Sequence, residues 1–201
     1  MKLTSFLLGA FALVATAVAQ QTPTVKSEPF NIIVLAANPA YNGTYLSGLR
    51  AGPFVNKMTF SKTTFTSKPY YLNTTQGSKY GGHLCSDYTG STSAGNLTIP
   101  LNFRVEGDLS TNLASTWMSV TGKATDGVEF SQDGLMGLHV GGHDDAKMPD
   151  PKLVMAGPKV LCRWVACKEF GPYGGIMDTL MWVSGGKPQN PTCYDVSLKR
   201  I

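Results

Sequence analysis

Glycine and proline divide this chain into short segments, and this punctuation limits its fold more than any other feature. The 201 residues include 22 Gly and 12 Pro, and no stretch longer than about two turns repeats its apolar residues with a helical period. The segments between these glycines and prolines have the residue pattern of strands. They are Phe30 to Ala36, Thr44 to Leu49, Val55 to Ser61, Tyr70 to Asn73, His83 to Asp87, Leu97 to Val105, Ser115 to Thr121, Val128 to Gln132, Leu135 to Val140, Lys152 to Met155, Lys159 to Cys167, Met177 to Val183 and Tyr194 to Lys199. The pattern predicts an all-β protein of about twelve short strands.

Partial internal similarity indicates how these strands are connected. Thr44 to Ser47 resembles Thr116 to Ser119, and a Gly-Gly-His follows in each half, ending at His83 and at His143. A third unit would begin at Lys152. Three similar units are typical of a β-trefoil, and a β-sandwich is the alternative if the similarity arose by chance.

The N-terminus has the composition of a secretory signal peptide. Lys2 precedes an uncharged apolar run from Phe6 to Ala19, which ends in the small residues of a cleavage site. The run is too short to span a bilayer, which takes about 20 apolar residues. We therefore expect residues 1–19 to be a signal peptide, 20–28 a disordered leader, and 29–201 a single all-β domain that is secreted and has no membrane partner.

The charge distribution argues against one large class of partner. The chain has 17 Lys and Arg against 13 Asp and Glu, a formal net charge of +4, and these residues are spread along the sequence. Nucleic-acid-binding proteins instead cluster Lys and Arg on one face. We therefore expect no nucleic acid partner, and a cell-wall polysaccharide or a host protein is the partner that we expect.

Four cysteines in an exported chain predict two disulfides, because the secretory route is oxidising. Cys162 and Cys167 lie in one predicted strand, where positions five apart face opposite sides of a sheet. They therefore need different partners. We predict one bond between Cys167 and Cys193 and a second between Cys85 and Cys162, with Cys162 beside Trp164 on the inward face.

Three N-x-T sequons, at Asn42, Asn73 and Asn96, predict N-glycans in an exported protein. None follows Thr98. We therefore hypothesise that glycans cover the surface built by the first half of the chain and leave the second half free for contacts.

The sequence has no motif of a catalytic or metal site. His139 and His143 have H-x3-H spacing, but the two glycines between them would break the helix that this metal-binding pattern needs. The serines between Gly90 and Gly95 lack the spacing of a nucleophile elbow. Glu106 and Asp108 are expected in a solvated turn. We expect no catalytic residue, no metal and no cofactor.

Two groups of aromatic residues have alternative interpretations. Tyrosines in a region rich in Gly, Ser and Thr could stack on sugars, but half-buried rings with a wet hydroxyl are the more ordinary arrangement; these are Tyr70, Tyr71, Tyr80 and Tyr88. The tryptophans lie in apolar strand contexts and are expected in the core; these are Trp117, Trp164 and Trp182.

The sequences GPKVLCRWVAC, ending at Cys167, and TLMWVSGGKPQNPTC, ending at Cys193, recur in a known group of proteins together with the tail Tyr194 to Arg200. The chain resembles the small secreted proteins of filamentous fungi known as IgE-binding proteins. This resemblance implies an exported, allergen-like protein and supplies no catalytic residues. In these proteins the counterpart of Cys162 is often Tyr, which implies that the bond between Cys85 and Cys162 is an addition in this chain.

The function expected from these features is non-enzymatic. The Pro-rich segment before Cys193 is predicted to be a stapled hairpin, and Lys187 to Asn190 is the candidate recognition loop within it. We expect a secreted or cell-wall-associated binding protein of allergen or effector character. The alternatives are a trefoil-type protease inhibitor that presents Lys187 to Pro191, and a hydrolase whose site is not visible in the sequence.

Overall fold

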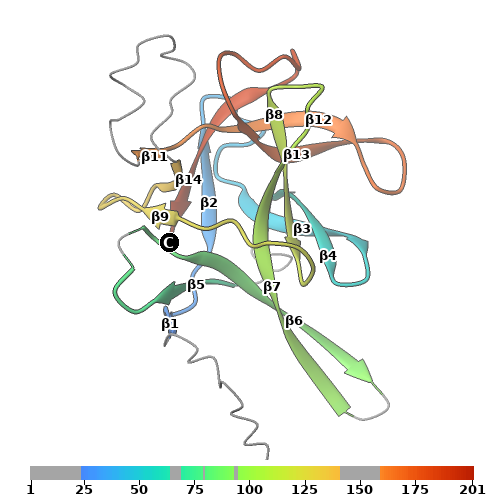
Figure 1. Cartoon of the computed structure of the whole chain (residues 1–201). Coiled ribbons are helices and arrows are strands. Elements are labelled where there is room, and N and C mark those ends of the chain that lie inside the picture. The colour runs from blue at the N-terminus through green and yellow to red at the C-terminus, as the bar shows by residue number, and fades with distance from the viewer. Residues whose placement is uncertain (1–23, 64–68, 79, 93–94, 141–158) are drawn as a thin grey trace, which may run out of the picture.

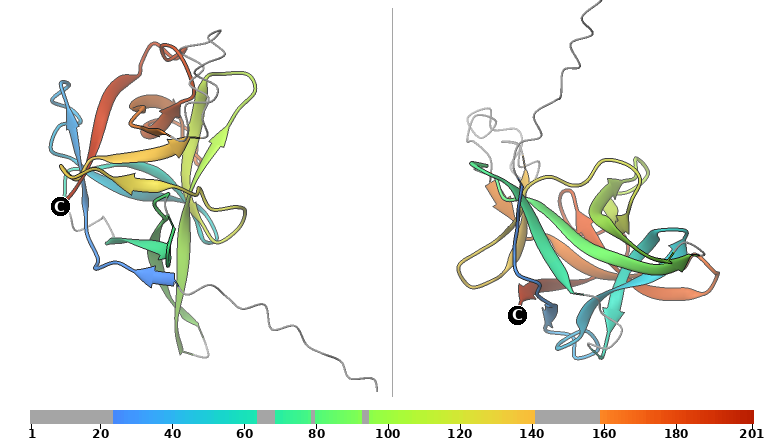
Figure 2. Two further views of the ribbon diagram at one scale, coloured as in Figure 1. Left: turned by 60° about the vertical axis from the view of Figure 1, so that its left-hand side comes forward. Right: turned by 90° about the horizontal axis from the view of Figure 1, so that it is seen from below.

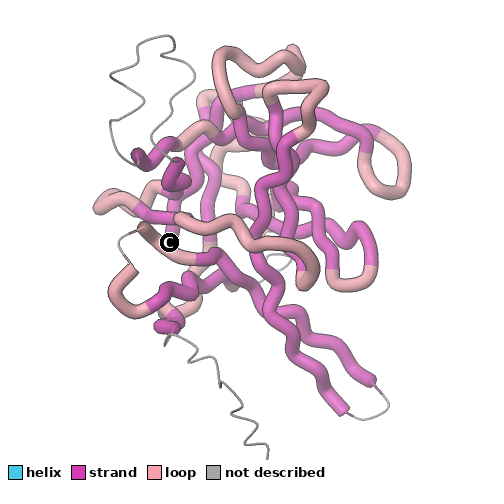
Figure 3. The backbone as a smooth tube through the Cα atoms, viewed as in Figure 1, coloured by secondary structure: helices cyan, strands magenta, loops and turns pink. Residues whose placement is uncertain are grey.

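The computed structural model describes residues 24–63, 69–78, 80–92, 95–140 and 159–201. Within these ranges the chain has 14 strands and no helix, as Figure 3 shows, so the all-β prediction is confirmed. In the described part, no helix is long and apolar enough to cross a membrane. The predicted signal peptide, His143 and the expected strand from Lys152 to Met155 lie outside the described residues.

Eleven strands form one antiparallel sheet in the order β1-β5-β6-β7-β8-β13-β12-β14-β2-β3-β4 (Figure 1). They are β1 Thr24–Lys26, β2 Ile32–Ala36, β3 Tyr45–Gly52, β4 Val55–Ser61, β5 Tyr70–Thr75, β6 His83–Thr92, β7 Gly95–Gly107, β8 Leu113–Ser119, β12 Trp164–Phe170, β13 Ile176–Val183 and β14 Tyr194–Arg200. A second sheet of three strands contains β9 Val128–Phe130, β10 Met136–Val140 and β11 Lys159–Leu161. The three-unit arrangement of a β-trefoil stays a prediction.

The strand β4 closes the large sheet on itself. Its first half pairs with β8, where Lys57 lies opposite Trp117. Its second half pairs with β13, where Thr59 lies opposite Thr179. Because β8 and β13 also pair with each other, three strands meet at this point, which we call the β4–β8–β13 junction. The sheet thus encloses one face and leaves the other on the outside.

The enclosed face holds the main core, built around Trp164. Its ring centroid is 4.7 Å from that of Trp182 and 5.9 Å from that of Phe103, both in edge-on geometry. The indole Nε1 of Trp164 donates to the carbonyl oxygen of Met136 at 2.8 Å, which satisfies its polar atom and fastens β12 to the small sheet. The prediction that Trp164 and Trp182 lie in the core is confirmed. Figure 2 shows the small sheet lying across the large one.

The prediction that Trp117 lies in the core was wrong. Alternation along β8 turns Thr116 and Met118 to the enclosed face, where both are buried, and sends Trp117 to the outer face, where it is half-buried. There its ring lies 4.3 Å from the Nζ atom of Lys57. An apolar strand context therefore did not distinguish the two sides of β8.

Lys57 is the charged residue that fastens the β4–β8–β13 junction. Its side chain is 3% exposed, and its Nζ donates to Ser115 Oγ at 2.8 Å and to Glu169 Oε1 at 2.9 Å. The other carboxylate oxygen of Glu169 accepts a hydrogen bond from Thr179 at 2.7 Å. One ammonium group thus joins β4, β8 and β12, and the carboxylate adds β13. A buried charge is tolerable because it is paired and hydrogen-bonded.

The expected disordered leader, residues 20–28, contains a strand. Thr24–Lys26 pairs with β5 from Thr24 opposite Thr75 to Lys26 opposite Asn73. Lys26 Nζ also lies 3.6 Å from the ring centroid of Tyr71 and 3.3 Å from Asp87. Lys26, one of the polar residues that suggested disorder, therefore makes contacts on the outer face of β5 and β6.

We predict that Lys57→Met lowers the free energy of unfolding by about 2–4 kcal/mol, because the Glu169 carboxylate loses its buried cation. Urea denaturation measures this loss. Lys168→Met is the matched control, since the Lys168–Asp178 pair is about half exposed on both sides and an exposed pair contributes less than about 1 kcal/mol. Equal losses for the two variants would contradict the role given to Lys57.

Candidate functional site

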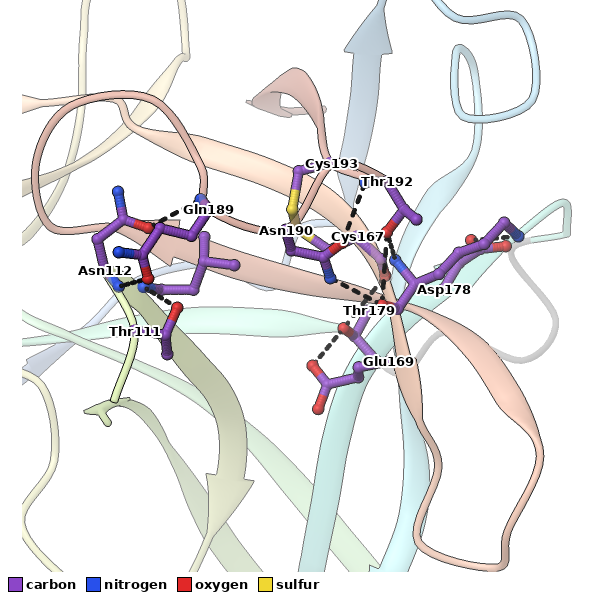
Figure 4. Close-up of a disulfide and its surroundings, with 12 residues drawn as sticks. Thr111, Asn112, Cys167, Glu169, Asp178, Thr179, Gln189, Asn190, Thr192 and Cys193 are labelled. Atoms are coloured by element: carbon purple, nitrogen blue, oxygen red, sulfur yellow. Dashed lines mark hydrogen bonds and ion pairs between the residues drawn. A yellow bond between two sulfur atoms is a disulfide. The ribbon is translucent and has the colours of Figure 1, made fainter. Parts of the chain in front are cut away.

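A disulfide joins Cys167 on β12 to Cys193, directly before β14, as predicted (Figure 4). The Cα atoms are 4.1 Å apart, and 26 positions separate the two residues in sequence. The bond lies within a small apolar cluster on the outer face of the sheet, formed with Leu113, Val165, Met181 and Val183. It therefore holds the segment between β13 and β14, residues 184–193, against that face. We call this segment the return loop.

The predicted bond between Cys85 and Cys162 is absent, and both residues are free thiols. The prediction assumed one continuous strand from Lys159 to Cys167, but the structure breaks it into β11 and β12, which belong to different sheets. Cys162 lies in the break and is exposed. Cys85 is buried on β6 and its Sγ donates to the side chain of Asn102 on β7 at 3.3 Å. The two thiols therefore lie on different elements with separate surroundings.

One side chain, that of Asn112, braces the first half of the return loop. Its Nδ2 donates to the carbonyl oxygens of Gly185 at 2.6 Å and Lys187 at 2.7 Å. Its Oδ1 accepts from the Gln189 backbone N–H at 3.1 Å. Gly186, between the two carbonyls, has φ of +65°, a conformation that glycine adopts without steric cost. Three backbone groups of the loop are thus fixed by one amide.

A second amide, that of Asn190, braces the other half of the loop against β12. Asn190 Nδ2 donates to the carbonyl oxygen of Lys168 at 2.9 Å, and Asn190 Oδ1 accepts from the Thr192 backbone N–H at 3.0 Å. The Thr192 hydroxyl in turn accepts from the Lys168 backbone N–H at 3.0 Å. These side chains bond the edge of β12 past the end of its ladder with β14. Figure 4 shows Asn190 and Thr192 beside Cys167. The loop is therefore held at both ends and in the middle.

The turn between β7 and β8, residues 108–112, lies beside the return loop because it ends at Asn112 (Figure 1). The Asp108 carboxylate accepts hydrogen bonds from the backbone N–H and the hydroxyl of Ser110, both at 2.8 Å. These bonds hold the pKa of the Asp108 carboxyl below its ordinary value. Leu109, inside this turn, is fully exposed, at 109%. The turn is thus fixed while its apolar side chain faces solvent.

Two braced segments therefore present side chains at one end of the molecule. Leu109 comes from the β7–β8 turn, and Lys187 and Gln189, both exposed, come from the return loop. We call these three residues and the backbone between them the loop surface. The sequence predicted a stapled hairpin here and offered Lys187 to Asn190 as a candidate recognition loop, but Leu109 and Asn112 carried no signal beyond their place in a polar turn.

A cleft of about 830 Å³ adjoins the return loop on the outer face of β2, β12 and β14. Its lining combines aliphatic residues with polar and charged ones and includes Leu35, Asn42, Arg163, Val165, Pro188 and Asp195. Arg163 donates to the carbonyl oxygen of Ser184 at 2.7 Å, so the cleft lining and the return loop are joined directly.

The predicted glycosylation sites do not divide the surface by halves of the chain. Asn42 is exposed and lines the same cleft as Arg163 and Asp195 from the second half, so a glycan there would also lie beside residues of the second half. Asn96 is exposed at the start of β7, and Asn73 is half-buried within β5. The glycans themselves stay a prediction.

Two histidines, His139 and His83, contact carboxylates, whereas His143 lies outside the described residues. His139 Nε2 contacts Glu129, and His83 Nε2 contacts Asp126, which holds the pKa of the Asp126 carboxyl below its ordinary value. Among the residues that the structure describes, no three His, Cys, Asp or Glu side chains gather as a metal site would require.

Glu106 was expected in a solvated turn. It lies on β7 against Arg104 instead, which corrects that expectation.

The tyrosines do not form an exposed platform. Tyr70 and Tyr71 are buried and Tyr88 is half-buried against Phe54. Tyr80 is 51% exposed and lies edge-on to His139. The ordinary interpretation of half-buried rings therefore fits Tyr88 best, and a stack of several exposed rings for sugar binding is not formed by this group.

One family model, described as Domain of unknown function (DUF7907), matches residues 27–201 of the chain. No curated protein and no solved structure matches the chain.

We predict two reactive thiols in the unfolded protein and one in the native protein. Cys162 is exposed, whereas only 1% of Cys85 is exposed. Burial raises the pKa of both thiols, that of Cys85 to about 11. A thiol-specific chromogenic reagent should therefore titrate Cys162 at once and Cys85 only after denaturation. Cys162→Ser should abolish the fast reaction. Finding no thiol in denaturant would mean that a second disulfide forms.

We predict that Asn112→Ala speeds hydrogen exchange of the Gln189 backbone amide by about tenfold or more, because that N–H loses its acceptor. Residue-resolved NMR exchange measures this change. Asn190→Ala is the matched control and should speed exchange at Thr192 instead. The brace would be contradicted if Gln189 exchanged at the same rate in wild type and in Asn112→Ala.

Proposed function

We propose that this chain, which belongs to the DUF7907 family, is a secreted, non-enzymatic protein. In this proposal it binds an extracellular protein through its loop surface. The observation that carries this proposal is the bracing of the return loop by Asn112, Asn190 and the Cys167–Cys193 bond. The allergen-like or effector-like character implied by the resemblance to fungal IgE-binding proteins, and a location outside the cell or in the wall, are parts of the same proposal.

Bracing matters for binding because association costs less entropy when the contacting segments are already fixed. The hydrogen bonds of Asn112 and Asn190 hold the backbone, yet Leu109, Lys187 and Gln189 keep their side chains exposed. A fixed backbone that exposes an apolar group, a cation and an amide together matches the mixture of contacts found in protein interfaces. Stability of the fold alone would not require those side chains to face solvent.

A protein partner is favoured over the alternative, a wall polysaccharide. Sugar sites stack rings on exposed aromatic faces, and the one tryptophan that lines the cleft, Trp164, is 1% exposed. The exposed groups at this end are aliphatic, amide and ammonium instead. The cleft lining, with Arg163 and Asp195, would extend the contact area around the loop surface.

Protease inhibition is the second candidate function. The observation that favours it is the exposure of Lys187 on a loop whose carbonyl groups are held on both sides of Gly186. A serine protease with an acidic specificity pocket would accept such a lysine side chain. The trefoil arrangement that this alternative assumed stays a prediction, and the candidate depends on the loop alone.

The test is a binding screen of the mature protein against purified extracellular proteins, including trypsin-like proteases, and against insoluble chitin and β-glucan. We expect at least one protein partner whose affinity falls about tenfold or more in L109D/K187E. The F170D/I176D variant, altered at a distant hairpin, is the matched control and should bind normally. Inhibition of a protease that is lost in Lys187→Ala would select the second candidate. Binding to polysaccharide alone, unchanged in L109D/K187E, would contradict the proposal.

A further inference from the structure

The tip of the β12–β13 hairpin exposes three large apolar side chains that the loop surface does not include. Phe170 is 82% exposed, Tyr173 71% and Ile176 70%. Phe170 and Ile176 lie opposite each other in the register, so their side chains share one face of the hairpin. Large exposed apolar groups gathered at one place mark interaction sites in soluble proteins.

The hairpin carries this tip away from the rest of the protein. The ladder of β13 with β4 is at Thr179, and that of β12 with β14 involves Val165 and Ala166. Beyond these positions the return loop still bonds the Lys168 backbone, and from there the described strand pairs run only across the hairpin, as far as Phe170 opposite Ile176. Figure 1 shows the hairpin reaching out at the right-hand side. The tip therefore protrudes, and in the described part of the chain its backbone pairs with no third strand.

The turn at the tip satisfies much of its own backbone. The Gly171 N–H donates to the Gly175 carbonyl oxygen at 2.9 Å, and the Gly174 N–H donates to the Gly171 carbonyl oxygen at 3.1 Å. Gly174 and Gly175 both have φ of +80°, which permits this tight closure. Backbone groups paired in this way lose little on leaving bulk water.

The charges nearest the tip are already paired within the protein. All eight residues from Phe170 to Met177 are uncharged. Behind them, Lys168 Nζ lies 3.1 Å from Asp178 Oδ1, and Glu169 is bonded to the buried Lys57 at 2.9 Å. No charge would therefore need to lose its partner if the tip entered an apolar environment.

From this combination we propose that the β12–β13 tip inserts into the interfacial layer of a lipid bilayer. A protruding tip would need a matching concavity on a protein partner, whereas a fluid bilayer surface adapts to its shape. Phe and Tyr favour that interface, where an apolar ring and a polar hydroxyl are both accommodated. The formal net charge is +4 for the whole chain and +3 without Lys2, which lies in the predicted signal peptide, and this positive charge favours anionic lipid. The sequence predicted no membrane partner because it lacks a later spanning segment, but a tip that lies in the interface needs none.

Three side chains give only weak, reversible attachment, so charge should act as the second signal. Anchoring by a single small apolar group is marginal, and stable attachment takes two signals. Binding should therefore be stronger on anionic than on zwitterionic vesicles and should weaken with added salt. Because the tip is remote from Leu109 and Lys187, a partner bound to the loop surface should not change the binding of the protein to vesicles.

The experiment is co-sedimentation of the mature protein with vesicles of phosphatidylcholine, with or without about 30 mol% phosphatidylserine. We expect binding to the anionic vesicles, and an about tenfold or greater loss of partitioning in F170D/I176D. The side chains are exposed, so this variant should fold, which circular dichroism checks. L109D is the control, since it changes a fully exposed apolar residue at another place and should bind as the wild type does.

A second measurement reports on depth directly. Phe170→Trp places an indole at the tip, and its emission should shift to shorter wavelength with anionic vesicles. The proposal would be overturned if the wild type stayed in the supernatant with both vesicles, or if F170D/I176D bound as strongly as the wild type, which would indicate attraction by charge alone. A protein partner that needs Phe170 and Ile176 in the absence of vesicle binding would overturn it too.

Discussion

The position of β4 across both β8 and β13 is the constraint on which the rest of this structure depends. Lys57 fixes this position, because a buried ammonium group needs hydrogen-bond acceptors. Its acceptors are Ser115 on β8 and Glu169 on β12. Any slip of β4 by one residue would turn Lys57 toward the enclosed core and Met58 outward. The polar network therefore selects one register for the closed sheet, in addition to the burial that drives closure.

The loop surface follows from that closure. With β8 and β13 held together, Leu113 lies opposite Val183, and the residues just outside this pair, Asn112 and Ser184, meet as the Ser184 N–H donates to the Asn112 carbonyl oxygen at 2.9 Å. The Asn112 side chain can then reach the loop carbonyls, while the disulfide fixes the far end. The same elements that bury the core thus place a fixed, exposed backbone at one end, and a free hairpin tip at another.

The sequence predicted those features that depend on local pattern. Turn residues and apolar segments predicted an all-β chain, and Val55–Ser61 is a strand with the predicted bounds. Patterns did not show which face a residue occupies or which strands are neighbours. Trp117 was expected in the core because its neighbours are apolar, and Cys162 was paired with Cys85 because a break before Trp164 was not visible. Asn112 could not be found, because its role arises only when β8 and β13 lie side by side.

The central claim is that the loop surface is rigid before any partner arrives. Backbone ¹⁵N relaxation of the mature protein measures this most directly, at the amides of Gly185, Gly186, Lys187, Gln189 and Leu109. The account predicts order parameters close to those of the flanking strands, about 0.8 or higher, whereas values below about 0.6 would show flexible loops and would contradict it.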